Sequence, residues 1–330
     1  MAFVIARESS TGALVVRPAI ARRRRRIAAE PELSHLRWWP ALVAALLCCA
    51  LPACAYFANH YLVHPGHEPA GVESWSDDVP ADQLLIHVRG ARPRGEGVFP
   101  AIVVHPEGGK TAADMQGVVW DLAQHGYAAI AADYERQVDG GYHHTMFAWR
   151  SPADATAILD VAQRYPFVGS QRLGLLGFSQ GAVFSLLIAE YAPDRIAAVV
   201  AYYPVVDFPR WLDQRDARFD KRLAFSVIRW YFRRESGATT DAEFEAILHA
   251  ASPYYGAEQI TAPVLLVHGD RDTTAPLEES QRMAARLSEL GRPVELLVVP
   301  EGRHIFNFRQ PPPAALAWQA TLAWFADYLR

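Results

Sequence analysis

The chain has 330 residues, 51% of them hydrophobic and 21% charged, which is the composition of a globular protein with a full buried core. Its formal net charge of -4 is small for this length and does not indicate a nucleic-acid partner. The three cysteines, Cys48, Cys49 and Cys54, lie near the N-terminus, which excludes a disulfide, a cysteine nucleophile and a cysteine-based zinc site from the rest of the chain.

The N-terminal region combines a basic leader, residues 1–37, with a segment free of charged side chains, residues 38–58. About 20 such residues span a bilayer as a helix, which predicts a membrane anchor. The same segment resembles a secretory signal cleaved after Ala55, or a bacterial lipobox with Cys54 lipidated. We expect a protein that is exported or membrane-anchored, with its folded domain outside the cytoplasm. The alternative is a soluble protein with a hydrophobic N-terminal tail.

Residues 59–83 are rich in Pro, Gly, His and Asp without periodicity, and are interpreted as a tether leading into one domain over residues 84–330. From Leu84 onward, short β-rich runs alternate with helical patterns, which is typical of a mostly parallel sheet with helices on both faces. We expect strands at 84–88, 99–104, 128–132, 173–177, 196–202, 264–268 and 294–299. We expect helices at 112–125, 153–164, 181–191, 277–290 and 314–329.

One interval, about residues 205–260, is far longer than the usual connection and is rich in aromatic and basic side chains. We interpret it as a mostly helical insertion before the strand at 264–268. Ligands of such sheets bind at the carboxyl ends of the strands, so the insertion is placed to shape a substrate pocket. A flap that only stabilises the domain is the alternative.

The sequence Gly177-Phe178-Ser179-Gln180-Gly181 fits the G-x-S-x-G nucleophile elbow and lies between an expected strand and an expected helix. Ser179 therefore falls on the sharp turn that exposes a hydroxyl above the sheet, where side chains at the flanking glycines would collide with backbone. The backbone N–H of Gln180 is a candidate oxyanion donor. An ordinary turn of small residues is the alternative.

A serine nucleophile needs a base and a carboxylate that orients it. Two candidate acids, Asp270 and Asp272, follow the strand at 264–268, and His304 follows the last strand. The order serine, aspartate, histidine at successive strand ends favours a catalytic triad over isolated surface groups.

The loop after the strand at 99–104 is expected to supply the second oxyanion donor, the N–H of Glu107 or Gly108. The loop ends in Gly109-Lys110-Thr111, but it lacks the first glycine of a phosphate-binding loop. Several side chains near strand ends are candidates for the substrate pocket, with surface or packing roles as the alternative: Tyr134, Arg136, His143, His144, Tyr203 and Trp211.

From about Val98 to Arg330 the chain resembles the dienelactone hydrolase and prolyl-oligopeptidase branch of the α/β-hydrolase superfamily. The part of that branch that carries the acid is matched by Ser252-Pro253-Tyr254, by Ile260 through Pro276, and by the helix that follows. The resemblance implies the α/β-hydrolase fold, and it implies that the acid is the aspartate three residues after Gly269, which is Asp272. Two departures stand out: dienelactone hydrolases use a cysteine where this chain has Ser179, and too few residues precede Leu84 for the β-propeller that such oligopeptidases carry.

These observations predict a carboxylesterase that cleaves a small-molecule ester through an acyl-enzyme and needs no metal or organic cofactor. A serine peptidase or an acyltransferase with the same triad is the first alternative. A catalytically silent, tethered binding protein is the second. The sequence does not favour one oligomeric state over another.

Overall fold

The computed structural model describes residues 63–144, 149, 151–169, 172–213 and 219–329, although the side chains of residues 219–221 are not described. All of these residues belong to one compact unit within 47–330. The expected leader and the expected signal or anchor, residues 1–37 and 38–58, lie outside them. In the part of the chain that is described, none of the helices combines the length and the apolar character needed to cross a membrane.

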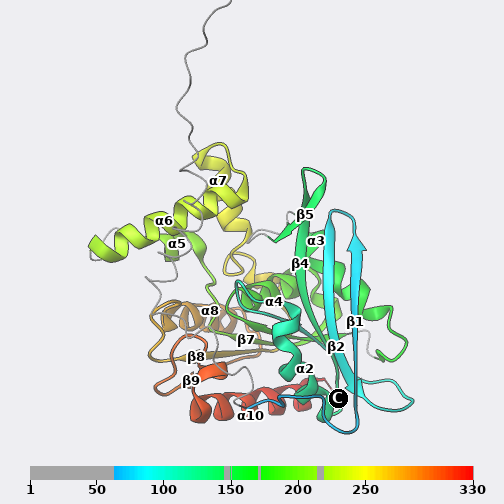
Figure 1. Cartoon of the computed structure of the whole chain (residues 1–330). Helices are drawn as coiled ribbons and strands as arrows, with labels where there is room; N and C mark the ends of the chain where they lie inside the picture. Colours follow the sequence, from blue (N-terminus) through cyan, green and yellow to red (C-terminus); the bar gives the residue numbers. More distant parts are fainter. Residues whose placement is uncertain (1–62, 145–148, 150, 170–171, 214–218, 330) are drawn as a thin grey trace, which may run out of the picture. The chain divides into compact units, whose positions relative to one another are not determined.

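The described residues form one nine-stranded sheet in the order β1-β2-β4-β3-β6-β7-β8-β9, with β5 paired to β4 (Figure 1). The pairs from β4 through β3 to β9 are parallel, whereas β1, β2 and β5 pair antiparallel. The strands are β1 Val72–Ala81, β2 Leu84–Pro93, β3 Ala101–His105, β4 Ala128–Val138, β5 Gly141–His144, β6 Leu173–Phe178, β7 Ile196–Tyr202, β8 Val264–Gly269 and β9 Val294–Val299. The expected mostly parallel sheet is confirmed.

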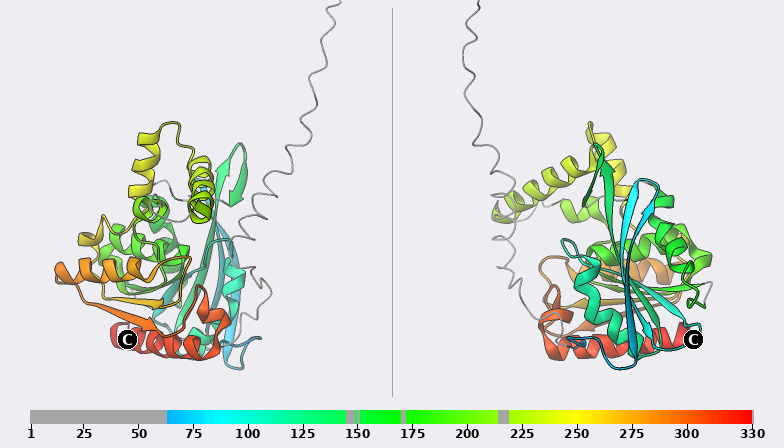
Figure 2. Two further views of the ribbon diagram at one scale, coloured as in Figure 1. Left: turned by 90° about the vertical axis from the view of Figure 1, so that its left-hand side faces the viewer. Right: turned by 45° about the vertical axis from the view of Figure 1, so that its right-hand side comes forward.

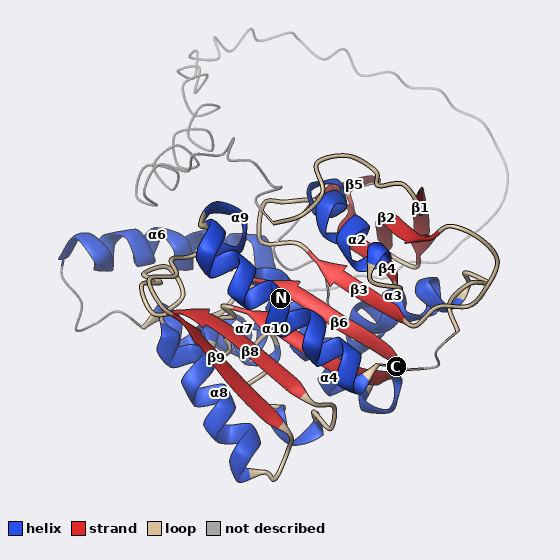
Figure 3. Cartoon of the chain, turned by 90° about the horizontal axis from the view of Figure 1, so that it is seen from below, coloured by secondary structure: helices blue, strands red, loops and turns tan. Residues whose placement is uncertain are grey.

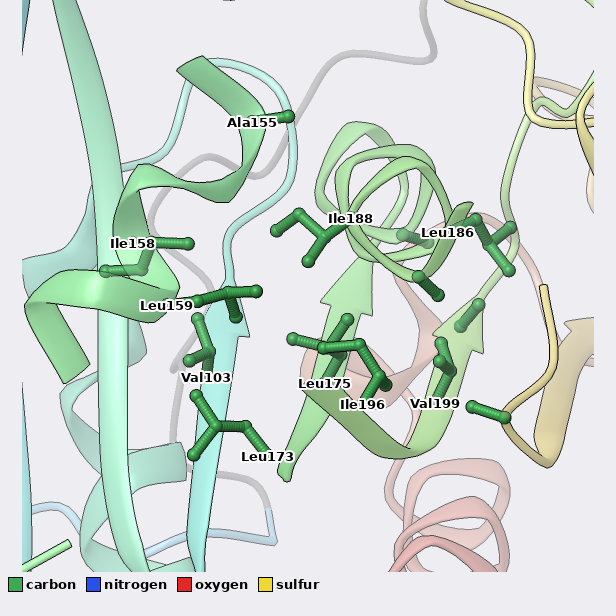
Figure 4. Packing of buried hydrophobic residues seen from close by; sticks show 14 of the residues in the cluster. Val103, Ala155, Ile158, Leu159, Leu173, Leu175, Leu186, Ile188, Ile196 and Val199 are labelled. Atoms are coloured by element: carbon green, nitrogen blue, oxygen red, sulfur yellow. The ribbon is translucent and has the colours of Figure 1, made fainter. Parts of the chain in front are cut away.

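Helices cover both faces of this sheet (Figure 3). Because successive side chains of a strand point to opposite faces, Val199 of β7 packs in one core cluster and Val200 in the other. The first cluster contains α3 (Pro152–Gln163), α4 (Gln180–Tyr191) and α8 (Leu277–Glu289), and Figure 4 shows part of it. The second contains α2 (Gln116–Gln124) and α10 (Pro311–Tyr328). The all-buried strands β3, β6, β7 and β8 have the continuous apolar sequence that such a double layer requires.

The main corrections concern the antiparallel strands. Strand β1 (Val72–Ala81) lies inside the segment interpreted as a tether, so the sheet begins before Leu84. Ala81 pairs with Leu84, which leaves a two-residue turn in which Asp82 has φ 53°. Strand β5 (Gly141–His144) was also not expected. Both strands are partly exposed and polar, so they lack the apolar run that marks the central strands.

The expected helix at 112–125 consists of a short 3₁₀ segment, η2 (Ala112–Met115), followed by α2. Three further short helices were not expected: η3 (Pro193–Arg195), η4 (Ala257–Gln259) and α9 (Phe306–Arg309). The other expected helices agree with the structure to within three residues at either end.

The insertion at 205–260 is helical, as expected, and contains α5 (Phe208–Leu212), α6 (Phe219–Ser236) and α7 (Asp241–Ala250). It packs on α4 through a third apolar cluster that includes Val183, Leu187, Phe208 and Phe232. Figure 2 shows the insertion and the β4–β5 hairpin at the same end of the domain, opposite α10. The candidate site residues lie at this end of the sheet, where the parallel strands terminate.

Candidate active site

Ser179 lies on the turn between β6 and α4 with φ 52° and ψ -113°, a conformation that costs free energy for any residue with a side chain. Its N–H donates to the carbonyl of Tyr202 at 2.9 Å. A Cβ on Gly177 would lie 2.1 Å from the carbonyl oxygen of Gly181, and a Cβ on Gly181 would lie 2.2 Å from that of His105. The two glycines therefore allow the backbone packing that holds Ser179 in its strained turn.

The structure brings Ser179, His304 and Asp272 together in one line of hydrogen bonds. Ser179 Oγ lies 3.1 Å from His304 Nε2, and His304 Nδ1 lies 2.7 Å from Asp272 Oδ2. The other carboxylate oxygen of Asp272 accepts the N–H groups of Thr274 and Ala275 at 2.8 and 2.9 Å. With a fully buried side chain, Asp272 is fixed in the orientation in which it holds the histidine ring.

The second candidate acid, Asp270, is exposed, and His304 bonds to Asp272 instead. The loops that carry the acid and the histidine touch at two glycines: a Cβ on Gly269 would lie 2.1 Å from the carbonyl oxygen of Gly302. The N–H of Arg271 donates to that same carbonyl at 2.9 Å. This contact sets the distance between the two loops and so between Asp272 and His304.

Two buried residues support the pair formed by Asp272 and His304. The ring of Tyr203 lies 4.7 Å from that of His304, and its hydroxyl donates to Asn307 Oδ1. On the far side, His268 Nε2 lies 3.6 Å from Asp272 Oδ2 and 2.9 Å from the carbonyl of Ala275. Burial lowers the pKa of His268, which keeps this ring neutral beside the aspartate.

The loop after β3 lies against the first turn of α4. A Cβ on Gly108 would lie 3.2 Å from Gln180 Oε1, and the N–H of Lys110 closes a turn onto the carbonyl of Glu107. Among the described residues, the N–H groups of Glu107 and Gly108 donate to no backbone carbonyl. The loop that carries both expected donors therefore lies against Gln180, the residue after Ser179.

Glu107 is 9% exposed, and Oε2 of its side chain is buried without a hydrogen-bond partner in the described part of the chain. Burial raises its pKa to about 7, against the opposing effect of the positive charges on His304, Lys110 and Arg309. The sequence drew attention only to the backbone of this residue.

Two cavities meet beside the elbow and share Gln180 and Phe184. The first, here called the polar cavity, measures about 250 Å³ and lies between the loop after β3, the middle of β4, β5 and Tyr231 of α6. The second, here called the apolar cavity, measures about 240 Å³ and lies between α4, the start of α3 and the insertion. The insertion thus contributes to the walls of both.

Only some of the pocket residues expected from the sequence line a cavity. Tyr134 and His144 line the polar cavity. Four do not line either cavity. His143 is exposed on β5, Arg136 pairs with Asp154 at 3.0 Å, Tyr203 packs on His304, and Trp211 Nε1 donates to the carbonyl of Thr274 at 3.1 Å.

Sequence reasoning missed other lining residues, among them Trp149, Phe184 and Tyr231. For Phe184 a signal existed, because Val183 and Phe184 follow Ser179 by about one helical turn and so lie beside it. For Tyr231 the signal was the aromatic content of the insertion, although it did not single out this residue. For Trp149 the sequence offers none, because tertiary packing alone brings it there.

Comparisons with known proteins agree with this architecture. A family model described as the prolyl oligopeptidase family matches residues 149–330, more than half of the chain. The uncharacterized peptidase YtmA of Bacillus subtilis is 26% identical over 58% of this chain and 69% of its own length. A carboxymethylenebutenolidase-like protein of Salmonella typhimurium is 25% identical over 78% of this chain and 86% of its own length.

Among solved structures, that of a dienelactone hydrolase-like protein of Klebsiella pneumoniae matches with a TM-score of 0.56 and 23% identity, over 78% of this chain and 99% of the other. That likeness confirms the α/β-hydrolase fold. On the family match, the chain belongs to the prolyl oligopeptidase family of serine hydrolases, in the branch that also includes dienelactone hydrolases.

Proposed function

We propose that this protein is a carboxylesterase that cleaves a small-molecule ester through an acyl-enzyme on Ser179. The observation that carries the proposal is the line of hydrogen bonds from Ser179 Oγ through His304 to Asp272, with distances of 3.1 and 2.7 Å. A serine hydroxyl becomes a useful nucleophile only beside a base that an acid orients, and these contacts provide both.

In the proposed reaction, His304 Nε2 takes the proton of Ser179 as Oγ attacks the ester carbonyl. Asp272 stabilises the imidazolium that results, and the N–H groups of Gln180 and of Glu107 or Gly108 hold the oxyanion. His304 then gives its proton to the departing alcohol. Water activated by the same ring attacks the acyl-enzyme and releases the acid, which restores Ser179.

Two observations favour an ester as the substrate. The Salmonella relative, whose name indicates action on a butenolide, a cyclic ester, aligns over most of its length with most of this chain. In addition, the two adjoining cavities offer separate places for the acyl and alcohol parts of a small molecule. A serine peptidase is the second candidate, supported by the family match and by YtmA. An acyltransferase would use the same acyl-enzyme with another acceptor.

A fluorophosphonate probe tests the nucleophile directly. Wild-type protein is expected to be labelled on Ser179, whereas Ser179→Ala and heat-unfolded protein are not. Equal labelling of wild type and Ser179→Ala, or no labelling of wild type, would contradict a serine-hydrolase mechanism and leave a silent binding protein. Matched esters and anilides with one shared acyl group then separate esterase from peptidase by their kcat/KM values.

We also propose that the full chain is exported or membrane-anchored, on the basis of the basic leader and the charge-free residues 38–58. Fractionation of cells that express the full chain tests this, with mass spectrometry of its N-terminus. A shortened N-terminus indicates cleavage, an intact N-terminus in the membrane fraction indicates an anchor, and loss of membrane association in Cys54→Ala indicates lipidation. Intact protein in the cytoplasm would contradict the proposal.

A further inference from the structure

The polar cavity contains two buried hydrogen-bond acceptors that have no partner among the described residues. Within the described part of the chain, these are Glu107 Oε2 and Asp133 Oδ1. Two of the donors near them are engaged within the protein. Tyr134 pairs with His105 Nε2 at 2.8 Å, and Thr111 Oγ1 donates to Asp114 at 3.0 Å. Since unpaired buried acceptors are costly, a molecule that fills this cavity is favoured when it brings donors.

The charges of the cavity argue against an ionic ligand. Lys110 lines the cavity, and its positive charge and that of Arg309 act on Glu107. An ammonium group would meet these cations. A carboxylate or phosphate would meet Glu107 and Asp133, which line the same space. A neutral hydroxyl avoids both penalties. Because it donates and accepts, it pairs with the Glu107 carboxyl in either protonation state.

The walls of the cavity suit a ring that carries several hydroxyls. The aromatic side chains of Tyr134, Phe184 and Tyr231 line it, and their faces offer apolar surface to the C–H groups of such a ring. At about 250 Å³ the cavity is larger than the engineered cavity of about 150 Å³ that holds benzene. It therefore has room for one six-membered ring.

The two parts of an ester are assigned to the cavities from the relation of each cavity to Ser179 and His304, which line neither of them. The protonated histidine must reach the oxygen of the departing alcohol, and its charge acts on Glu107 of the polar cavity. The apolar cavity instead follows the face of α4 that begins at Ser179, past Val183 and Leu187. The alcohol is thus assigned to the polar cavity and the acyl chain to the apolar one.

We propose that the substrate is an ester of an apolar acyl group with a neutral polyhydroxylated alcohol, such as a sugar, and that Glu107 and Asp133 accept hydrogen bonds from its hydroxyls. This inference rests on the proposed esterase function and names its substrate class. The side chains of Glu107 and Asp133 determine specificity in it, because they bind the leaving group and take no part in bond breaking.

The test compares phenylpropionate esters of three alcohols: methanol, methyl glucoside and choline. Wild type is expected to favour the glucoside over the methyl ester by about tenfold or more in kcat/KM, as hydrogen bonds to charged acceptors allow, and to show no preference for choline. Glu107→Gln and Asp133→Asn should each lower the ratio of glucoside to methyl ester toward one. The control is Glu289→Gln, which makes the same change of charge at an exposed residue and should leave the ratio of glucoside to methyl ester unchanged.

The outcomes separate the inference from the function on which it rests. Three results would overturn the inference but not the esterase function. They are similar kcat/KM values for the three esters, a preference for the choline ester, and a ratio of glucoside to methyl ester that both substitutions leave unchanged. Absence of ester hydrolysis together with absence of fluorophosphonate labelling would overturn both. Thermal unfolding of each variant shows whether the protein is folded, so that a change in the ratio caused by misfolding is recognised.

Discussion

Asp272 Oδ2 lies 2.7 Å from His304 Nδ1, and the opposite oxygen of the same carboxylate is held by the N–H groups of Thr274 and Ala275. Asp272→Asn replaces one carboxylate oxygen by an NH2 group. Because the two backbone N–H groups hold the remaining oxygen, the NH2 group faces Nδ1 and cannot accept its proton, so the ring loses the tautomer that presents Nε2 to Ser179. We expect kcat to fall by about 10³- to 10⁴-fold. Asp270→Asn, two residues away and exposed, should stay within about twofold of wild type. Equal losses in both variants would contradict the assignment of the acid.

The positions of these three residues follow from local sequence. Ser179 sits between a strand of continuous apolar residues and a helix, and glycines fix its turn. Asp272 and His304 follow the next-to-last and last strands, and parallel strands deliver their carboxyl ends to one edge of a sheet. The choice between Asp270 and Asp272 required the resemblance, because spacing alone does not show which of two near neighbours turns inward.

The close contact between Gly181 and the carbonyl of His105 predicts a difference between two glycine substitutions. In Gly181→Ala the new Cβ would lie 2.2 Å from a backbone oxygen, so we expect a loss of about 3 kcal/mol or more of unfolding free energy and slower labelling of Ser179. In Gly126→Ala, the new methyl group meets no atom within 4 Å, and only the positive φ of 93° is strained. That control should cost about 1–2 kcal/mol and leave labelling unchanged. Denaturant unfolding gives both values, and similar losses in the two variants would refute the steric argument.

The burial of Glu107 predicts a dependence of stability on pH. Its pKa rises from 4.5 to about 7 on folding, so the folded state binds more protons than the unfolded state within this window. Stability should therefore fall as pH rises from about 4.5 to 7, by up to about 3 kcal/mol for this group. His304, Lys110 and Arg309 oppose the rise in pKa, and Asp114 adds to it.

Glu107→Gln removes this titration while the other groups remain. The difference in unfolding free energy between variant and wild type should grow in favour of the variant across that window and then level off above pH 7. Glu289→Gln, whose carboxylate is exposed, should show no such trend. Urea unfolding at pH 4.5, 5.5, 6.5 and 7.5 gives the comparison, and parallel profiles for Glu107→Gln and wild type would contradict a raised pKa.

The features that the sequence did not predict depend on tertiary contacts. Strand β1 has only Val72 buried and exposes both aspartates of its centre, so it resembles a polar tether until β2 pairs with it. In the sequence, Glu107 is an acidic residue of a loop, and nothing near it indicates burial. Its burial follows from packing beside α4 and His304. Trp149 comes to face Phe184, at 4.1 Å between ring centroids, from a segment with no strand or helix pattern of its own.

The last prediction compares two neighbouring tyrosines. It distinguishes a residue that orients His304 from one that only stabilises the fold. Tyr202 and Tyr203 are both buried, and their hydroxyls bond to Thr321 and Asn307 respectively. Replacing either by phenylalanine leaves a buried polar partner without its bond, which should cost about 1–3 kcal/mol of unfolding free energy. Tyr203 packs its ring 4.7 Å from His304 and, through Asn307, fixes the segment just after that residue.

We therefore expect Tyr203→Phe to lower kcat about threefold to tenfold with little change in KM, because the ring of His304 is held less well at the distance and angle that proton transfer requires. Tyr202→Phe should match it in stability but keep the kcat of wild type. Steady-state kinetics at a temperature well below both unfolding transitions makes the comparison. Equal kcat values for the two variants would show that Tyr203 supports the fold of the region and not the orientation of the histidine.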